Sequence, residues 1–253
     1  MSSLSLVVFA VLTQASVGLV LAGSWLLPDG VGGRLAFPLA AVGLLVSLAH
    51  LGAPAGAVRA LANLRCSWLS REVLLTGLFA LAAGVYGWAT PTPAAGAAAA
   101  VLGGGALIAQ AMVFQLPTRP EWRHWANLLS PFAGAALVGA LAGALVTGTD
   151  LAALRSLGAL VLVASAFVLL TSASWAAHLV RLGRGTILGD TWFWVRLVAG
   201  VLLPALAGLA LCLGVPPDWL TTGGALAGAV AGELIGRSLF YRVGQEPSPA
   251  TQF

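Results

Sequence analysis

Residues 156–179 read SLGALVLVASAFVLLTSASWAAHL, 24 consecutive positions without Asp, Glu, Lys or Arg. A helix needs about 20 apolar residues to cross roughly 30 Å of hydrocarbon, so this stretch predicts a transmembrane helix. Runs of the same character lie on both sides of it. The predicted spans cover residues 4–27, 34–53, 72–90, 94–116, 128–149, 156–179, 192–214 and 219–241.

The composition agrees with a membrane domain. Hydrophobic side chains make up 59% of the 253 residues and charged side chains only 8%, against about 25% charged in soluble domains. This composition excludes a soluble enzyme. The runs lack the alternation of a membrane β-barrel and are rich in Ala, Leu and Gly. We expect an all-α bundle of eight transmembrane helices that forms a single membrane domain over residues 1–253.

All twelve basic residues are arginines, and their distribution predicts the topology. With eight spans, both termini and connections two, four and six share one face. The opposite face carries only Arg34 and Arg155. The positive-inside rule therefore predicts cytoplasmic termini in a bacterial inner membrane, and the +4 charge does not indicate nucleic-acid binding. The arginine-rich face carries Arg59, Arg65, Arg71, Arg119, Arg123, Arg181, Arg184, Arg196, Arg237 and Arg242.

Ionisable side chains inside predicted spans are candidates for function, because hydrocarbon penalises them. His50 lies one turn inside the end of the second span, and Glu72 opens the third span at the same face. Glu233 lies past the middle of the eighth span, and Arg237 follows at a spacing that lets the two side chains pair. We interpret His50 and Glu72 as a functional pair rather than a helix-end hydrogen bond and a helix-dipole charge. Glu233 and Arg237 are interpreted as a structural or proton-path pair.

A neutral histidine beside a carboxylate suits quinol oxidation. The histidine can accept a proton from a quinol hydroxyl, and the carboxylate can pass it to water. The chain has two cysteines and no C-x-x-C motif, too few thiolates for an iron–sulfur cluster. The electron acceptor must therefore belong to a partner subunit or to a bound haem. A haem held by His50 and His178 stays open as an alternative, whereas His124 between Trp122 and Trp125 indicates an interfacial position.

Other functional classes have less support. No H-E-x-x-H, P-loop or G-x-S-x-G motif occurs. A small-molecule or ion transporter, with the Glu233 and Arg237 pair in its path, is the leading alternative, although the internal symmetry of many transporters is not evident. Small residues at every fourth position let helices pack closely. The eighth span has such a ridge, which predicts tight packing within the bundle, at Gly224, Gly228, Gly232 and Gly236.

Four stretches carry a family resemblance. They are residues 50–54 (HLGAP), 69–72 (LSRE), 118–122 (TRPEW) followed by 130–132 (SPF), and 232–237 (GELIGR) with 240–241 (FY). In order and spacing, over nearly the whole chain, they resemble the DmsC family, the membrane anchor subunits of dimethyl sulfoxide reductase. The chain is somewhat shorter than the best-known members of that family, with trimmed connections.

The resemblance implies a membrane anchor that holds a molybdopterin catalytic subunit and a four-cluster iron–sulfur subunit. Such an anchor passes electrons between the menaquinone or ubiquinone pool and the iron–sulfur subunit, and itself contains no haem, metal or iron–sulfur cluster. In that family a histidine and a glutamate occupy the positions of His50 and Glu72, and we expect Arg71 and Arg59 to belong to the same quinol-binding and proton-transfer site. We expect the iron–sulfur partner to dock on the arginine-rich face, at a rim formed by Arg59, Arg65, Arg119, Arg123, Arg181 and Arg184.

Overall fold

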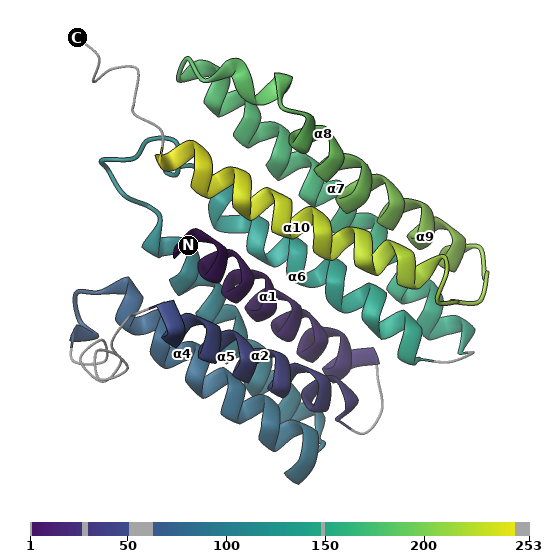
Figure 1. The fold of residues 1–253 in the computed structure, drawn as a ribbon. Coiled ribbons are helices and arrows are strands. Elements are labelled where there is room, and N and C mark those ends of the chain that lie inside the picture. The colour runs from purple at the N-terminus through teal and green to yellow at the C-terminus, as the bar shows by residue number, and fades with distance from the viewer. Residues whose placement is uncertain (1, 27–29, 51–62, 148–149, 246–253) are drawn as a thin grey trace.

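The computed structural model describes residues 2–26, 30–50, 63–147 and 150–245, and within these residues it contains helices and no strand. Figure 1 shows the helices packed roughly along one direction. The first half of the chain forms α1 (Ser2–Leu26), α2 (Val31–His50), α4 (Trp68–Gly84) with a π-helical continuation η2 (Val85–Ala89), and α5 (Pro93–Val113).

The second half begins with α6 (Trp125–Val146) and the long helix α7 (Leu151–Arg181). After a short 3-10 helix, the chain forms three consecutive helical segments, the first and third α-helical and the second π-helical. A final helix returns along the bundle. These elements are η3 (Gly185–Gly189), α8 (Thr191–Leu197), η4 (Val198–Leu202), α9 (Leu203–Cys212) and α10 (Thr222–Gln245).

Helices α1 and α6 lie against each other in the middle of the bundle (Figure 1). On one side α1 packs against α2 and α5, and α4 packs against α5. On the other side α6 packs against α7 and α10, and α7 packs against α9. Both described ends of the chain, the start of α1 and the end of α10, lie at one end of the bundle. The end of α2, the start of α4 and the connections after α5 and α7 also lie there, and we call this the arginine-rich end.

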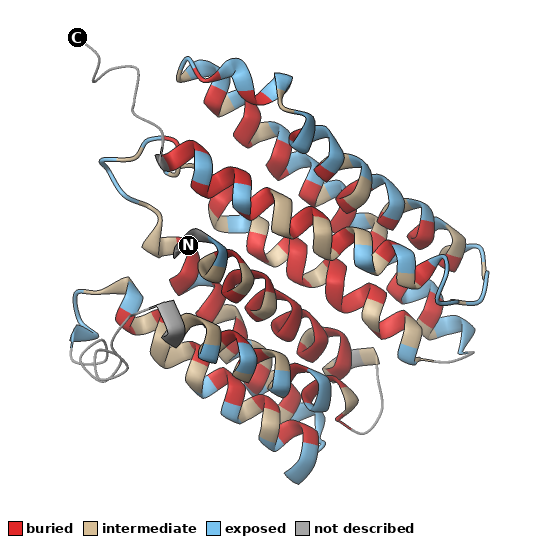
Figure 2. Cartoon of the chain, in the orientation of Figure 1, coloured by how far each residue is buried: buried red, intermediate tan, exposed pale blue. Residues whose placement is uncertain are grey.

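Six helical segments of the described chain are long and apolar enough to cross a membrane. Figure 2 shows buried residues where helices meet and exposed residues along the outer faces. Many of the exposed residues are large and apolar, including Leu81, Val101, Leu170 and Leu206, as expected of a lipid-facing surface. The all-α, multi-pass membrane architecture is confirmed. The predicted count of eight spans is not confirmed, because within the described residues α2 counts only as a shorter apolar helix, Val31–Ser47, and α10 is not among the six.

Local capping moves some predicted boundaries. The Ser67 side chain accepts a hydrogen bond from the Ser70 backbone N–H and caps α4, which therefore begins at Trp68 rather than at Glu72. The prediction that Glu72 opens its helix was wrong, since it lies in the second turn. A charge at a helix end is thus not the explanation for this carboxylate.

The predicted glycine ridge on α10 packs inside the bundle at three of its four positions. An added Cβ at Gly228 would lie 2.6 Å from the Ala199 carbonyl oxygen, and one at Gly232 would lie 2.5 Å from the Cα of Gly200. These contacts join α10 to the π-helical turn η4. Gly224 differs, because a Cβ there would meet nothing within 4 Å.

Candidate functional site

Glu72 is buried at the contact between α4 and α5, with 6% of its surface exposed. The Gln110 side chain on α5 lies beside this carboxylate and acts on it as a hydrogen-bonding group. Within the described chain, neither polar atom of the buried Gln110 amide has a partner at full hydrogen-bond geometry. Buried amides in proteins are almost always paired. The Gln110 amide beside the Glu72 carboxylate therefore has unused hydrogen-bonding capacity within the described chain.

Thr76 lies one turn beyond Glu72 on α4 and is fully buried. Its hydroxyl has no partner among the described residues. Other buried hydroxyls in this bundle donate back to their own helix, as Thr13 does to the Phe9 carbonyl oxygen at 2.9 Å. This back-bonding normally satisfies a hydroxyl in an apolar helix. Thr76 thus adds a second polar group with unused hydrogen-bonding capacity to the region of Glu72.

Tyr241 on α10 connects the Glu72 region to the polar residues of α10. It is 6% exposed, and both Glu72 and Arg237 are close enough to act on it electrostatically. Its ring packs edge-to-face on Phe114, with the centroids 5.3 Å apart. Glu72 and Arg237, one residue from each of the two predicted groups, therefore lie on either side of the same tyrosine near the arginine-rich end.

The remaining predicted quinol-site residues fall in different places. His50 is the last residue of α2, at the end of the bundle where α4 begins (Figure 1), and its side chain lies outside the description. Arg59 also lies outside the described residues. Arg71 holds the preceding turn, with Nε donating to the Leu64 carbonyl oxygen at 2.9 Å and Nη2 to that of Arg65 at 2.6 Å. Its role is structural in this arrangement.

Glu233 and Arg237 are joined through Gln14 of α1 rather than by a direct ion pair within the described chain. With the amide oriented to fit this network, the Gln14 NH₂ donates to Glu233 Oε2 at 3.0 Å. Its carbonyl oxygen accepts from Arg237 Nε at 3.1 Å and Nη2 at 2.5 Å. All three side chains are buried. An added Cβ at Gly134 of α6 would lie 2.7 Å from the Glu233 carboxyl carbon, so this glycine makes room for the carboxylate.

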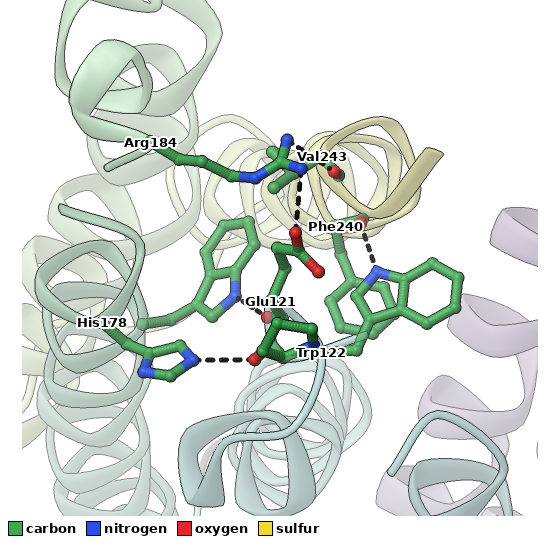
Figure 3. Close-up of polar contacts among 8 residues, drawn as sticks. Glu121, Trp122, His178, Arg184, Phe240 and Val243 are labelled. Atoms are coloured by element: carbon green, nitrogen blue, oxygen red, sulfur yellow. Dashed lines mark hydrogen bonds and ion pairs between the residues drawn. The ribbon is translucent and has the colours of Figure 1, made fainter. Parts of the chain in front are cut away.

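The connection between α5 and α6 is fixed by a second buried network (Figure 3). Arg184 Nη2 lies 2.8 Å from Glu121 Oε1, with the side chains 7% and 2% exposed. Arg184 Nη1 donates to the Val243 carbonyl oxygen at 3.2 Å, and Trp175 Nε1 donates to that of Glu121 at 3.2 Å. Arg184 was expected at an exposed docking rim. That expectation was wrong, because its charge is used inside the fold.

His124 and His178 stack on each other at the same connection, with ring centroids 4.5 Å apart. His124 Nδ1 accepts from the Ala126 backbone N–H at 3.3 Å and caps α6. His178 Nε2 lies 2.8 Å from the Pro120 carbonyl oxygen (Figure 3). One ring nitrogen of each histidine is therefore engaged in holding the connection.

Sequence reasoning missed Gln14, Gln110 and Thr76, and it placed Arg196 among the arginines that flank spans. The structure buries Arg196 to 7% exposure between α8 and α10. One signal was available, since all four are polar positions within apolar runs. What the sequence did not contain was which of these positions meet.

Comparison with known proteins adds no relative. No family model matches the sequence, and no curated protein matches it. The resemblance to the dimethyl sulfoxide reductase anchors therefore rests on the four stretches described above.

Proposed function

We propose that this chain is the quinol-binding membrane anchor subunit of a dimethyl sulfoxide reductase-type molybdopterin oxidoreductase. In this proposal it spans the bilayer eight times and passes electrons between the menaquinone or ubiquinone pool and an iron–sulfur subunit. The observation that carries it is the buried Glu72 carboxylate beside the Gln110 amide and the Thr76 hydroxyl, neither of which has a partner at full hydrogen-bond geometry among the described residues. The proposal that the chain is an anchor subunit rests on the sequence motifs that resemble that family.

The chemistry of these groups fits a quinol. A quinol ring offers two hydroxyls that donate and, after oxidation, two carbonyl oxygens that accept. The Glu72 carboxylate can accept a hydroxyl proton, and the Gln110 amide can donate to a ring oxygen. Oxidation yields two electrons, which pass to the partner's iron–sulfur cluster, and two protons, which leave toward water at the arginine-rich end. His50 is proposed as the second proton acceptor, from its place at the end of α2.

The decisive experiment compares matched variants. Glu72→Gln keeps the size of the side chain and removes the base, and should lower quinol-linked turnover of the complex by roughly two orders of magnitude. Gln110→Leu and Thr76→Val should weaken binding of a soluble naphthoquinol to the chain in nanodiscs. Thr13→Val is the control, because the Thr13 hydroxyl is buried but already bonded to its own helix.

Turnover with a soluble artificial donor bypasses the anchor and should stay near the unmodified level in every variant. Normal quinol-linked turnover in Glu72→Gln, or equal loss of naphthoquinol binding in Thr76→Val and Thr13→Val, would contradict the proposed site.

A transporter is the alternative that the buried charges of α10 favour. Purification separates the two, since an anchor brings down a molybdenum protein and an iron–sulfur protein, and the visible spectrum of the chain tests for haem.

We place the iron–sulfur partner on the arginine-rich end, because the Glu72 region lies near it and a partner at the other end would be separated from the quinol by most of the bilayer. Arg65, Arg123 and Arg181 are exposed there. Arg65→Glu with Arg123→Glu should release the partner from membranes or make its retention sensitive to salt. Arg155→Glu, exposed at the opposite end, is the matched control and should have no effect. If Arg155→Glu released the partner and the Arg65→Glu, Arg123→Glu variant did not, the proposed docking at the arginine-rich end would be wrong.

A further inference from the structure

Arg196 is a buried cation without a hydrogen-bond partner in the described part of the chain. It lies in α8, only 7% exposed, and its Nε is enclosed and unpaired. Its guanidinium rests on Gly236 of α10, where an added Cβ would lie 2.5 Å from Nε and 2.6 Å from Cζ. A guanidinium has five N–H donors and keeps its charge. Leaving such a group unpaired away from water is among the most costly arrangements in a fold.

The charges around Arg196 do not cancel. Glu233 attracts it and Arg237 repels it. Two guanidinium groups and one carboxylate leave a formal charge of +1 in the cluster. Gln14 is neutral and already bonds both Glu233 and Arg237. A single net charge inside a membrane bundle calls for a counter-ion of opposite sign.

A small polar cavity adjoins these charges. Its volume is about 20 Å³, and it lies between α6, α7, α8 and α10. A cavity of this size holds about one water or one small ion. The Thr171 and Ser172 hydroxyls donate to carbonyls of their own helix, which leaves the guanidinium groups as the charged donors at this space. Its lining includes Ser130, Thr171, Ser172, Arg196, Glu233 and Arg237.

We propose that this cavity binds one small monovalent anion of the halide class, held by charge-assisted hydrogen bonds from Arg196 and Arg237. The anion brings the charge of the cluster to zero and gives an acceptor to the Arg196 guanidinium, which has no hydrogen-bond partner among the described residues. Size excludes sulfate, phosphate and organic acids. Glu72, Thr76 and Gln110 do not line this cavity, and the proposal does not depend on quinol binding.

The test is the thermal unfolding of the purified full-length chain in nanodiscs, with sodium chloride exchanged for sodium gluconate at constant ionic strength. Chloride should raise the unfolding temperature saturably, and at a hundred times its dissociation constant should raise the folded-to-unfolded ratio about 100-fold. Arg196→Gln should abolish the chloride effect, because it removes the surplus charge.

Gly236→Ala should also abolish or strongly weaken the effect, because its Cβ displaces the Arg196 guanidinium. Gly224→Ala is the matched control on the same helix, with nothing within 4 Å of the new methyl group, and should keep the full effect. A crystal soaked in bromide should show anomalous scattering between Arg196 and Arg237, even if neither variant folds. Equal unfolding temperatures in chloride and gluconate, or no bromide peak there, would overturn the proposal and leave water as the occupant.

Discussion

Gly18→Ala tests how closely α1 and α6 pack at the centre of the bundle. A Cβ at Gly18 would lie 1.9 Å from the Ala135 carbonyl oxygen, and one at Gly139 would lie 2.1 Å from the Gly18 carbonyl oxygen. Carbon and oxygen in contact need about 3.3 Å, so the two helices would have to separate locally by about 1.4 Å. The atoms that each new Cβ would meet belong to the backbone of the facing helix, which cannot move aside as a flexible side chain could.

The expected cost follows from that displacement. Overpacking a well-packed core costs about 1–3 kcal/mol, and a gap of about 0.5–1 Å already forfeits a quarter to a half of a dispersion contact. We therefore expect Gly18→Ala to lower the free energy of unfolding by about 3 kcal/mol or more. Gly104→Ala is the control, because a Cβ there meets nothing within 4 Å. It should be neutral or stabilising by up to about 1 kcal/mol, since alanine favours the helix more than glycine does.

The measurement is the free energy of unfolding in mixed micelles, followed by tryptophan fluorescence during titration with a denaturing detergent. The chain has nine tryptophans to report the transition. The two substitutions should move the midpoint in opposite directions, or leave only the control unchanged. Equal shifts for Gly18→Ala and Gly104→Ala would refute the close approach of α1 and α6.

Three further predictions concern the arginine-rich end. Breaking the buried Glu121 and Arg184 ion pair with Glu121→Gln alone should destabilise the chain by about 3–5 kcal/mol, and Glu121→Leu with Arg184→Met should cost clearly less, which a double-mutant cycle in the same assay checks. Burial, then the charges of His178 and Arg181, lower the pKa of His124 below its usual 6.5. The folded chain therefore resists protonation of the His124 ring. Above about pH 6.5 the ring is neutral in both the folded and the unfolded chain, and stability is unaffected; as the pH falls toward the lowered pKa, the unfolded chain takes up the proton more readily and the folded state loses stability. His124→Asn keeps a cap for α6 and should reduce the difference in unfolding temperature between pH 7.5 and pH 5.0; an unchanged difference would assign the pH dependence to other groups. Finally, a reporter fused at Phe253 should be cytoplasmic, and a periplasmic signal would show that the arginines of this end are retained for function rather than for topology.

A buried polar residue could be identified from the sequence where one side chain stood out against its surroundings. Glu72, Glu233 and Arg237 were found because an ionisable residue within an apolar run is costly wherever the run packs. Gln14 and Gln110 carry no charge, so they stood out less, and their partners lie on helices distant in the chain. Arg196 and Arg184 resembled ordinary flanking arginines, because position relative to a span does not reveal whether a side chain faces water or a neighbouring helix.

What the sequence alone determined is the helical membrane character of the chain, since hydropathy and length act through each segment's own transfer into hydrocarbon. The tertiary structure alone decided which polar groups meet. Gln14 joins Glu233 and Arg237 across more than two hundred positions, and Glu121 meets Arg184 from a different connection. Such pairs depend on helix rotation and on close approach at residues such as Gly18 and Gly236. These are properties of two packed surfaces, and no single stretch of sequence contains them.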